Sequence, residues 1–186
     1  MLAILCLAFQ WVVAALLLLA FTGKLLSGVQ ANAEHVRNYR VVPGAWSNGV
    51  AAVLPPVELA LGLGLLLRLA LGVSVLVSAG LFLAFASVMT LALLRGVVTQ
   101  CGCYGTLHSA QVSWKLVVRN GVIAVLLVAT TAVRPVTPSV LHVSTTTTWA
   151  LYLSAFLAGL ALSQAGSSLA HRSGAGNPIE HSTKAG

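Results

Sequence analysis

Long apolar runs separated by short polar segments restrict the fold of this chain more than any other feature of its sequence. The runs begin near Leu2, Gly49, Leu71 and Trp114, and each extends for roughly 20 residues. A helix of about 20 apolar residues is long enough to cross the hydrocarbon core of a bilayer. Charged residues make up only 7% of the chain, whereas a soluble domain carries about 25%. The chain therefore has too few charges to cover a surface that faces water.

This composition excludes an ordinary soluble enzyme, a nucleic-acid-binding domain and a disordered protein. The net charge is +7, but the basic residues occur singly between apolar runs. In membrane proteins such residues mark loop ends and orientation. We therefore predict an all-α fold, an integral membrane helical bundle in the cell membrane, surrounded by the lipid bilayer and without a nucleic-acid partner.

The predicted bundle has four core spans and a shorter fifth span. The core spans are predicted at Leu2–Phe21, Gly49–Leu67, Leu71–Leu94 and Trp114–Val133. The stretch Ser27–Asn48 is too polar to span and is interpreted as an interfacial helix and loop, and Trp149–Ala165 is the predicted fifth span. Residues 1–134 then form a four-helix membrane domain, 135–165 a linker with the fifth span, and 166–186 a disordered tail.

The second and third spans contain residues that affect helix geometry. Pro55 and Pro56 are expected to break or kink the second span just before Glu58, because proline removes a helical hydrogen bond. Small residues allow helices in lipid to approach closely. The residues expected to serve this packing role are Gly62, Gly64, Gly72, Ser74, Ser78 and Gly80.

Polar side chains are predicted to converge in one half of the membrane. Successive spans reverse direction, so the end of the first span and the start of the second lie on the same side as the loop between the third and fourth. The polar cluster predicted there is Lys24, Glu58, Arg95, Lys115, Arg119 and Asn120. Glu58 is the only acid inside a span, and its expected partners are Lys24 and Arg119. Such a pair could fix helix register or take part in redox or proton chemistry, and the two roles are compatible.

Cys101 and Cys103 lie in the loop after the third span and carry the strongest chemical signal. Nearby cations, here Arg95, Lys115 and Arg119, favour the thiolate form of a cysteine. A disulfide between cysteines separated by one residue requires distorted geometry and is easily reduced, which suits a reversible dithiol–disulfide switch. Metal binding with His108 as a third ligand, or a structural or inert pair, are the alternatives. The lone cysteine of the first span is expected to be a packing residue.

These motifs resemble the methylamine-utilisation MauE family, within the wider DoxX-like group of small helical membrane proteins. The resemblance covers about residues 1–134 and follows the family's order of motifs. The motifs are Phe21–Leu25, Tyr39 with Val42 and Pro43, Pro55–Leu59, Cys101–Gly105, and Arg119 with Asn120. Tyr104 stands where the family usually has phenylalanine.

The resemblance implies an integral membrane accessory protein in thiol–disulfide chemistry, needed to mature a disulfide-rich dehydrogenase subunit. It implies that Cys101 and Cys103 exchange electrons with a thioredoxin-like redox protein or a disulfide-containing client. Two alternatives come from other classes of protein. One is a non-catalytic membrane scaffold, and the other is a quinone- or small-molecule-binding subunit of an oxidoreductase complex. Apart from a quinone in that alternative, no cofactor and no metal are expected.

The charge distribution and the implied redox role favour opposite orientations. Most basic residues lie on the same side as the Cys-Gly-Cys loop, and the positive-inside rule would place that side in the cytoplasm. A role in extracytoplasmic disulfide formation requires the loop on the other side.

Overall fold

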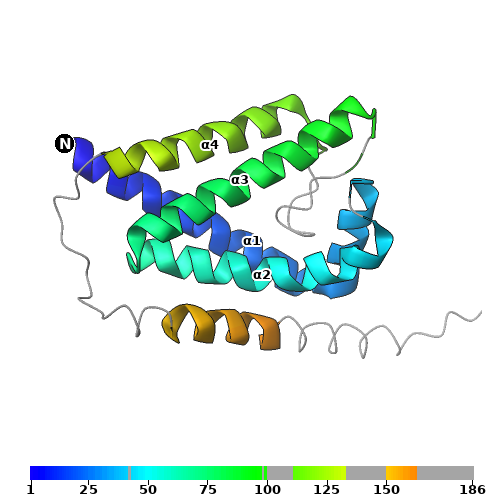
Figure 1. Cartoon of the computed structure of the whole chain (residues 1–186), viewed down its shortest axis with the longest axis horizontal. Coiled ribbons are helices and arrows are strands. Elements are labelled where there is room, and N and C mark those ends of the chain that lie inside the picture. The colour runs from blue at the N-terminus through cyan, green and yellow to red at the C-terminus, as the bar shows by residue number, and fades with distance from the viewer. Residues whose placement is uncertain (42, 98, 100–110, 133–149, 163–186) are drawn as a thin grey trace, which may run out of the picture.

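The computed structural model describes residues 1–41, 43–97, 99, 111–132 and 150–162. Four long helices follow one another in these residues (Figure 1): α1 (Leu2–Asn38), α2 (Gly44–Leu66), α3 (Leu71–Leu94) and α4 (Trp114–Ala132). All four are long and apolar enough to cross a membrane. The prediction of an all-α, multi-pass membrane bundle is confirmed. The described residues contain no β-strand.

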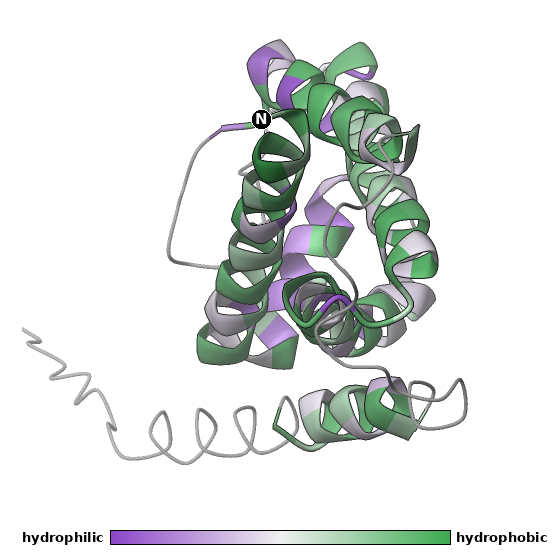
Figure 2. Ribbon diagram, turned by 90° about the vertical axis from the view of Figure 1, so that its left-hand side faces the viewer, coloured by the Kyte–Doolittle hydropathy of each residue, from purple (hydrophilic) through white to green (hydrophobic). Residues whose placement is uncertain are grey.

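The bundle consists of two closely packed helix pairs, α1 with α2 and α3 with α4. A core of apolar side chains fills its interior, and its largest members include Val13, Leu17, Leu65, Phe82 and Leu127. Many other large apolar side chains are exposed on the outside of the bundle, and hydrophobic residues predominate along the helices in Figure 2. An apolar exterior is suited to contact with lipid tails.

Tight connections hold the ends of the helices. Four residues join α2 to α3, and Arg68 and Ala70 adopt positive φ angles of 57° and 38° in this hairpin. At the other end of α3, Gly96 has φ 66°. The Gly96 and Val97 N–H groups donate to the carbonyls of Leu93 and Ala92, at 3.0 Å each. This is the Schellman arrangement, in which a glycine just after the helix allows the last carbonyls to be satisfied.

The first helix is longer than predicted, because its polar residues do not stop it. It extends beyond Phe21 to Asn38, with a single non-helical residue at Gly28. The side-chain hydroxyls of Thr22 and Ser27 donate to carbonyls one turn earlier, at 2.8 and 2.7 Å, so these polar groups are satisfied without leaving the helix. The predicted interfacial helix is therefore the last part of α1.

The second helix begins five residues earlier than predicted, directly after Pro43, and it runs through both internal prolines. Pro55 and Pro56 are fully buried and have helical neighbours on both sides, so of the expected break or kink, the structure contains no break. Proline in a helix leaves the carbonyl four residues earlier without its usual N–H partner.

The predicted packing role holds for only part of the small residues. A Cβ at Gly62 would lie 2.9 Å from the Leu18 side chain, so the glycine permits close approach of α1 and α2. Ser74 and Ser78 are buried. Gly72 and Gly80 have open space around them, so the prediction is wrong for these two. They lie on the outer face of α3, which the sequence spacing alone does not identify.

A shorter apolar helix, Ala150–Leu162, packs against α2 and the start of α3. The Tyr152 hydroxyl lies within hydrogen-bonding reach of the Ser74 hydroxyl and donates to the Leu69 carbonyl at 2.9 Å. A Cβ at Gly159 would lie 2.7 Å from the Pro56 backbone. This helix lies within the predicted fifth span but has fewer than the roughly 20 residues of an upright span. The predicted linker and tail lie outside the described residues.

We predict that Gly159→Ala destabilises the protein by about 1–3 kcal/mol, because the added methyl group must displace the Pro56 backbone. Gly121→Ala is the matched control, since a Cβ there would meet nothing within 4 Å. Thermal unfolding in detergent, followed by circular dichroism, measures both variants. Equal melting temperatures for the two variants would contradict the close contact between helix 150–162 and α2.

Candidate functional site

The Lys24 ammonium and the Glu58 carboxylate form a buried ion pair between α1 and α2. Lys24 Nζ lies 2.7 Å from Glu58 Oε1, and the side chains are 4% and 0% exposed. Charges at membrane depth are costly unless they are paired. The predicted contact between Lys24 and Glu58 is therefore confirmed. The predicted contact with Arg119 is wrong, because Arg119 is exposed on α4 and forms no ion pair with Glu58.

A change of helix direction at Gly28 brings the Asn32 side chain to the backbone of Lys24. Gly28 has φ 78° and ψ 161°, a conformation that strongly favours glycine. Four residues later, the buried Asn32 side chain donates from Nδ2 to the Lys24 carbonyl at 2.7 Å. The last part of α1 is thus attached to the turn that carries the buried lysine. The sequence analysis did not select Asn32, although a glycine followed four residues later by an asparagine was visible inside the polar stretch.

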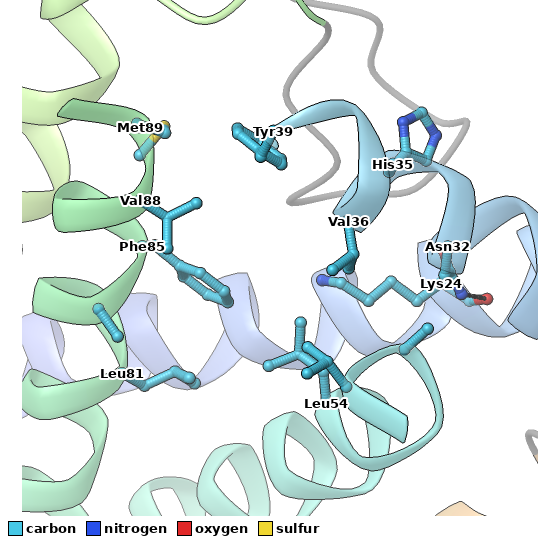
Figure 3. Close-up of a pocket in the computed structure, with 13 residues that line it drawn as sticks. Lys24, Asn32, His35, Val36, Tyr39, Leu54, Leu81, Phe85, Val88 and Met89 are labelled. Atoms are coloured by element: carbon cyan, nitrogen blue, oxygen red, sulfur yellow. Dashed lines mark hydrogen bonds between the residues drawn. The ribbon is translucent and has the colours of Figure 1, made fainter. Parts of the chain in front are cut away.

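A cavity of about 220 Å³ opens beside the ion pair, between the last part of α1, the first half of α2 and the second half of α3. Figure 3 shows the Lys24 side chain extending into it, with Leu54 and Phe85 on the walls. Lys24 Nζ lies 5.9 Å from the centre of the Phe85 ring, within the range of a cation–π interaction. The other side chains that line the cavity include Asn32, His35, Val36, Tyr39, Leu81, Val88 and Met89.

The cavity is mainly apolar, and its polar contact comes from the Lys24 ammonium. Asn32 Oδ1 and Glu58 Oε2 are buried and have no hydrogen-bond partner in the described part of the chain, but Figure 3 shows the Asn32 oxygen directed away from the cavity. The cavity can therefore accept a small molecule that is mostly apolar and accepts a hydrogen bond from Lys24.

The remaining members of the predicted polar cluster lie apart from the ion pair. Arg95 is exposed, and its guanidinium donates from Nη1 to the Arg40 carbonyl at 2.7 Å. Lys115 is exposed on the first turn of α4. Asn120 is 2% exposed, and its Nδ2 donates to the Leu116 carbonyl of its own helix at 2.8 Å. The predicted single polar cluster is therefore not found, because these side chains have other partners or are exposed.

Cys101 and Cys103 lie outside the described residues. The residues that flank their segment, which we call its anchors, are described. These anchors lie at the end of the bundle that is nearer to Lys24. On one side the segment follows the capped end of α3, and on the other it leads into α4 at Trp114. The Val112 N–H donates to the Thr99 carbonyl at 3.0 Å and joins the two sides. Cys6, in α1, is a half-buried free thiol.

These features define a small multi-pass helical membrane protein with a buried ion pair between its first two spans and a cysteine-containing segment after its third. Residues 2–133 match the family described as Methylamine utilisation protein MauE. The chain belongs to this family, and the predicted resemblance is confirmed.

Several relatives carry the name Methylamine utilization protein MauE. The protein from Paracoccus denitrificans is 35% identical over 160 residues, which cover 80% of this chain and 86% of the relative. The protein from Paracoccus versutus is 33% identical over 59% of this chain and 60% of its own length. The protein from Methylorubrum extorquens is 30% identical over 56% of each chain. No solved structure matches the chain significantly.

We predict that Lys24→Met and Glu58→Leu each destabilise the protein by about 3–5 kcal/mol, because each leaves one buried charge without its partner. The double variant is expected to recover most of this loss, since it buries neither charge. Thermal unfolding in detergent measures all three variants.

Arg119→Met is the matched control, because it removes an exposed cation and is expected to change stability by about 0.5 kcal/mol or less. Losses in the double variant that equal the sum of the two single losses would show that Lys24 and Glu58 do not stabilise each other.

Proposed function

We propose that this chain is a membrane accessory protein in methylamine utilisation, and that it acts through thiol–disulfide exchange at Cys101 and Cys103. The observation that carries the proposal is family membership over residues 2–133. The Cys-Gly-Cys pair falls within that range. The expected partner is a thioredoxin-like redox protein or a client protein that contains disulfides.

The proposed chemistry is a two-step exchange in which electrons and bonds balance. A thiolate of the pair attacks one sulfur of a partner disulfide, which forms a mixed disulfide and releases a partner thiolate. The second cysteine attacks the mixed disulfide, so the pair ends as a disulfide and the partner as a dithiol. The reverse sequence oxidises a partner dithiol and leaves Cys101 and Cys103 reduced.

The described part of the chain supports this chemistry in two ways. The segment that contains the cysteines starts and ends at one end of the bundle, where Val112 is hydrogen bonded to Thr99. Exposed cations lie at the same end, including Arg95 after α3 and Lys115 at the start of α4. Positive charge near a thiol favours the thiolate, which is the reactive form.

Cysteine replacement in a host that lacks its own MauE protein tests the proposal. In a Paracoccus denitrificans strain without its MauE, the wild-type chain and Cys6→Ser are expected to restore growth on methylamine. Cys101→Ser and Cys103→Ser are expected to abolish this activity, because one change removes the thiolate that forms the mixed disulfide and the other removes the thiol that resolves it. Immunoblots of membranes are expected to show equal insertion of all four proteins. Growth supported by both single Cys-loop variants would contradict the exchange mechanism and favour a non-catalytic scaffold.

Thiol labelling in intact cells tests the redox state and the orientation together. In a Cys6→Ala background, a membrane-impermeant maleimide is expected to label Cys101 and Cys103 only after mild reduction. That result would indicate an extracytoplasmic disulfide in spite of the charge bias. Labelling only after the cells are opened, with both thiols already free, would place the pair in the cytoplasm and contradict a role in extracytoplasmic disulfide formation.

The cavity beside Lys24 favours a second candidate function, binding of a quinone or another small apolar molecule for an oxidoreductase complex. The carbonyls of an oxidised quinone can accept a hydrogen bond from the Lys24 ammonium, which extends into the cavity. Solvent extraction and chromatography of the purified protein would detect a bound quinone. This candidate requires that Val88→Trp, which fills the cavity, lowers the amount of bound quinone. The matched control Leu83→Trp, on the exposed face of α3 and outside the cavity, is expected to leave it unchanged.

A further inference from the structure

Three arginines surround a polar cavity at the end of the bundle that anchors the Cys-Gly-Cys segment. Arg37 and Arg40 come from the end of α1, and Arg95 follows α3. The cavity has a volume of about 660 Å³, and Asn38 and Thr99 add polar groups to its wall. It is separate from the apolar cavity beside Lys24, since no residue lines both.

The geometry of this site is fixed by the backbone. Arg40 has φ 52°, in the left-handed region that residues other than glycine rarely adopt. Its carbonyl accepts the hydrogen bond from Arg95 Nη1 at 2.7 Å, and its N–H donates to the Arg37 carbonyl at 2.9 Å. These bonds connect α1 to α3 and bring three guanidinium groups to one cavity.

The cations of this cavity have no acidic partner among the described residues. The whole chain contains only three acids. Glu58 is bound to Lys24, and the exposed Glu34 does not line the cavity. The described wall therefore carries three positive charges and no carboxylate, a composition that attracts an anion.

Two tryptophans indicate where this cavity lies relative to the bilayer. Trp46 at the start of α2 and Trp114 at the start of α4 are 70% and 54% exposed. Both helices start at the end of the bundle where α1 and α3 finish. Exposed tryptophans are enriched at the level of lipid headgroups. The expected level of the arginine cavity is therefore that of the phospholipid phosphates.

We propose that this cavity binds the phosphate-containing headgroup of an anionic phospholipid. Guanidinium groups bind phosphate oxygens through paired, charge-assisted hydrogen bonds. Basic pockets between membrane helices are suited to such headgroups. The proposal does not depend on the redox chemistry of the cysteines.

Lipid binding to the full-length protein tests this proposal. The protein is purified in a mild detergent, and phosphatidylglycerol binding is followed by native mass spectrometry, with phosphatidylcholine and inorganic phosphate as comparison ligands. Arg37→Gln and Arg40→Gln are each expected to weaken phosphatidylglycerol binding about fivefold. Lys115→Gln, which removes an exposed cation at the same end but outside the cavity, is expected to change it less than twofold. Arg37→Lys and Arg40→Lys keep the charge and serve as a second pair should a glutamine variant not fold.

Each possible result either supports the proposal or overturns it. Selective loss in the cavity variants, with the lysine variants between wild type and glutamine, supports it. Equal weakening by Lys115→Gln would show general surface attraction and overturn the site. Inorganic phosphate that binds as tightly as phosphatidylglycerol would show a site for free anions and overturn the lipid assignment. Equal binding of phosphatidylcholine would do the same.

Discussion

The buried ion pair between Lys24 and Glu58 is the interaction on which the arrangement of the first two helices depends. Neither charge can remain at membrane depth alone, so α1 and α2 must pack with both residues at the same level. The close approach at Gly62 is compatible with that packing, because the glycine leaves room for Leu18. The ion pair thus fixes the relative level of the two helices, because sliding either one would leave a buried charge without its partner.

The cavity and the arginine site both lie where the two helix pairs meet. Contacts are dense within each pair and sparse between α1 and α4. At the polar end, the change of direction at Gly28 turns the last part of α1 toward α3, and the Arg95–Arg40 hydrogen bond connects the two pairs. The opposite end is held by a four-residue hairpin and by the buried hydrogen bond from Gln10 to Thr130, 3.0 Å long. The apolar cavity beside Lys24 and the arginine cavity lie toward the polar end, and a further apolar cavity of about 330 Å³ lies between α2, the start of α3 and helix 150–162.

Hydropathy and the alternating direction of successive spans predict much of this structure, because both follow directly from the order of the residues. The third helix was predicted at its observed bounds, and the contact between Lys24 and Glu58 follows from counting residues along antiparallel spans. The sequence therefore predicts how far along a helix a residue lies, but not which way its side chain faces around the helix axis. Arg119 follows the start of α4 as predicted, but it is exposed, because α4 packs against α3 with another face. The role of Asn32 depends on the dihedral angles of Gly28, which no periodicity encodes.

The polar features have a joint consequence for how the protein meets its partners. The anchors of the cysteine segment, the apolar cavity beside Lys24 and the arginine site all lie toward the same end of the bundle. In the proposed exchange, a redox partner would meet the membrane face at which the anchors of that segment and the arginines lie. The described part of that face carries cations with few acids to balance them, a composition that favours an acidic surface on such a partner. An anionic lipid in the arginine cavity would lower this positive charge, and the lipid composition of the membrane would then set how strongly an acidic partner is attracted.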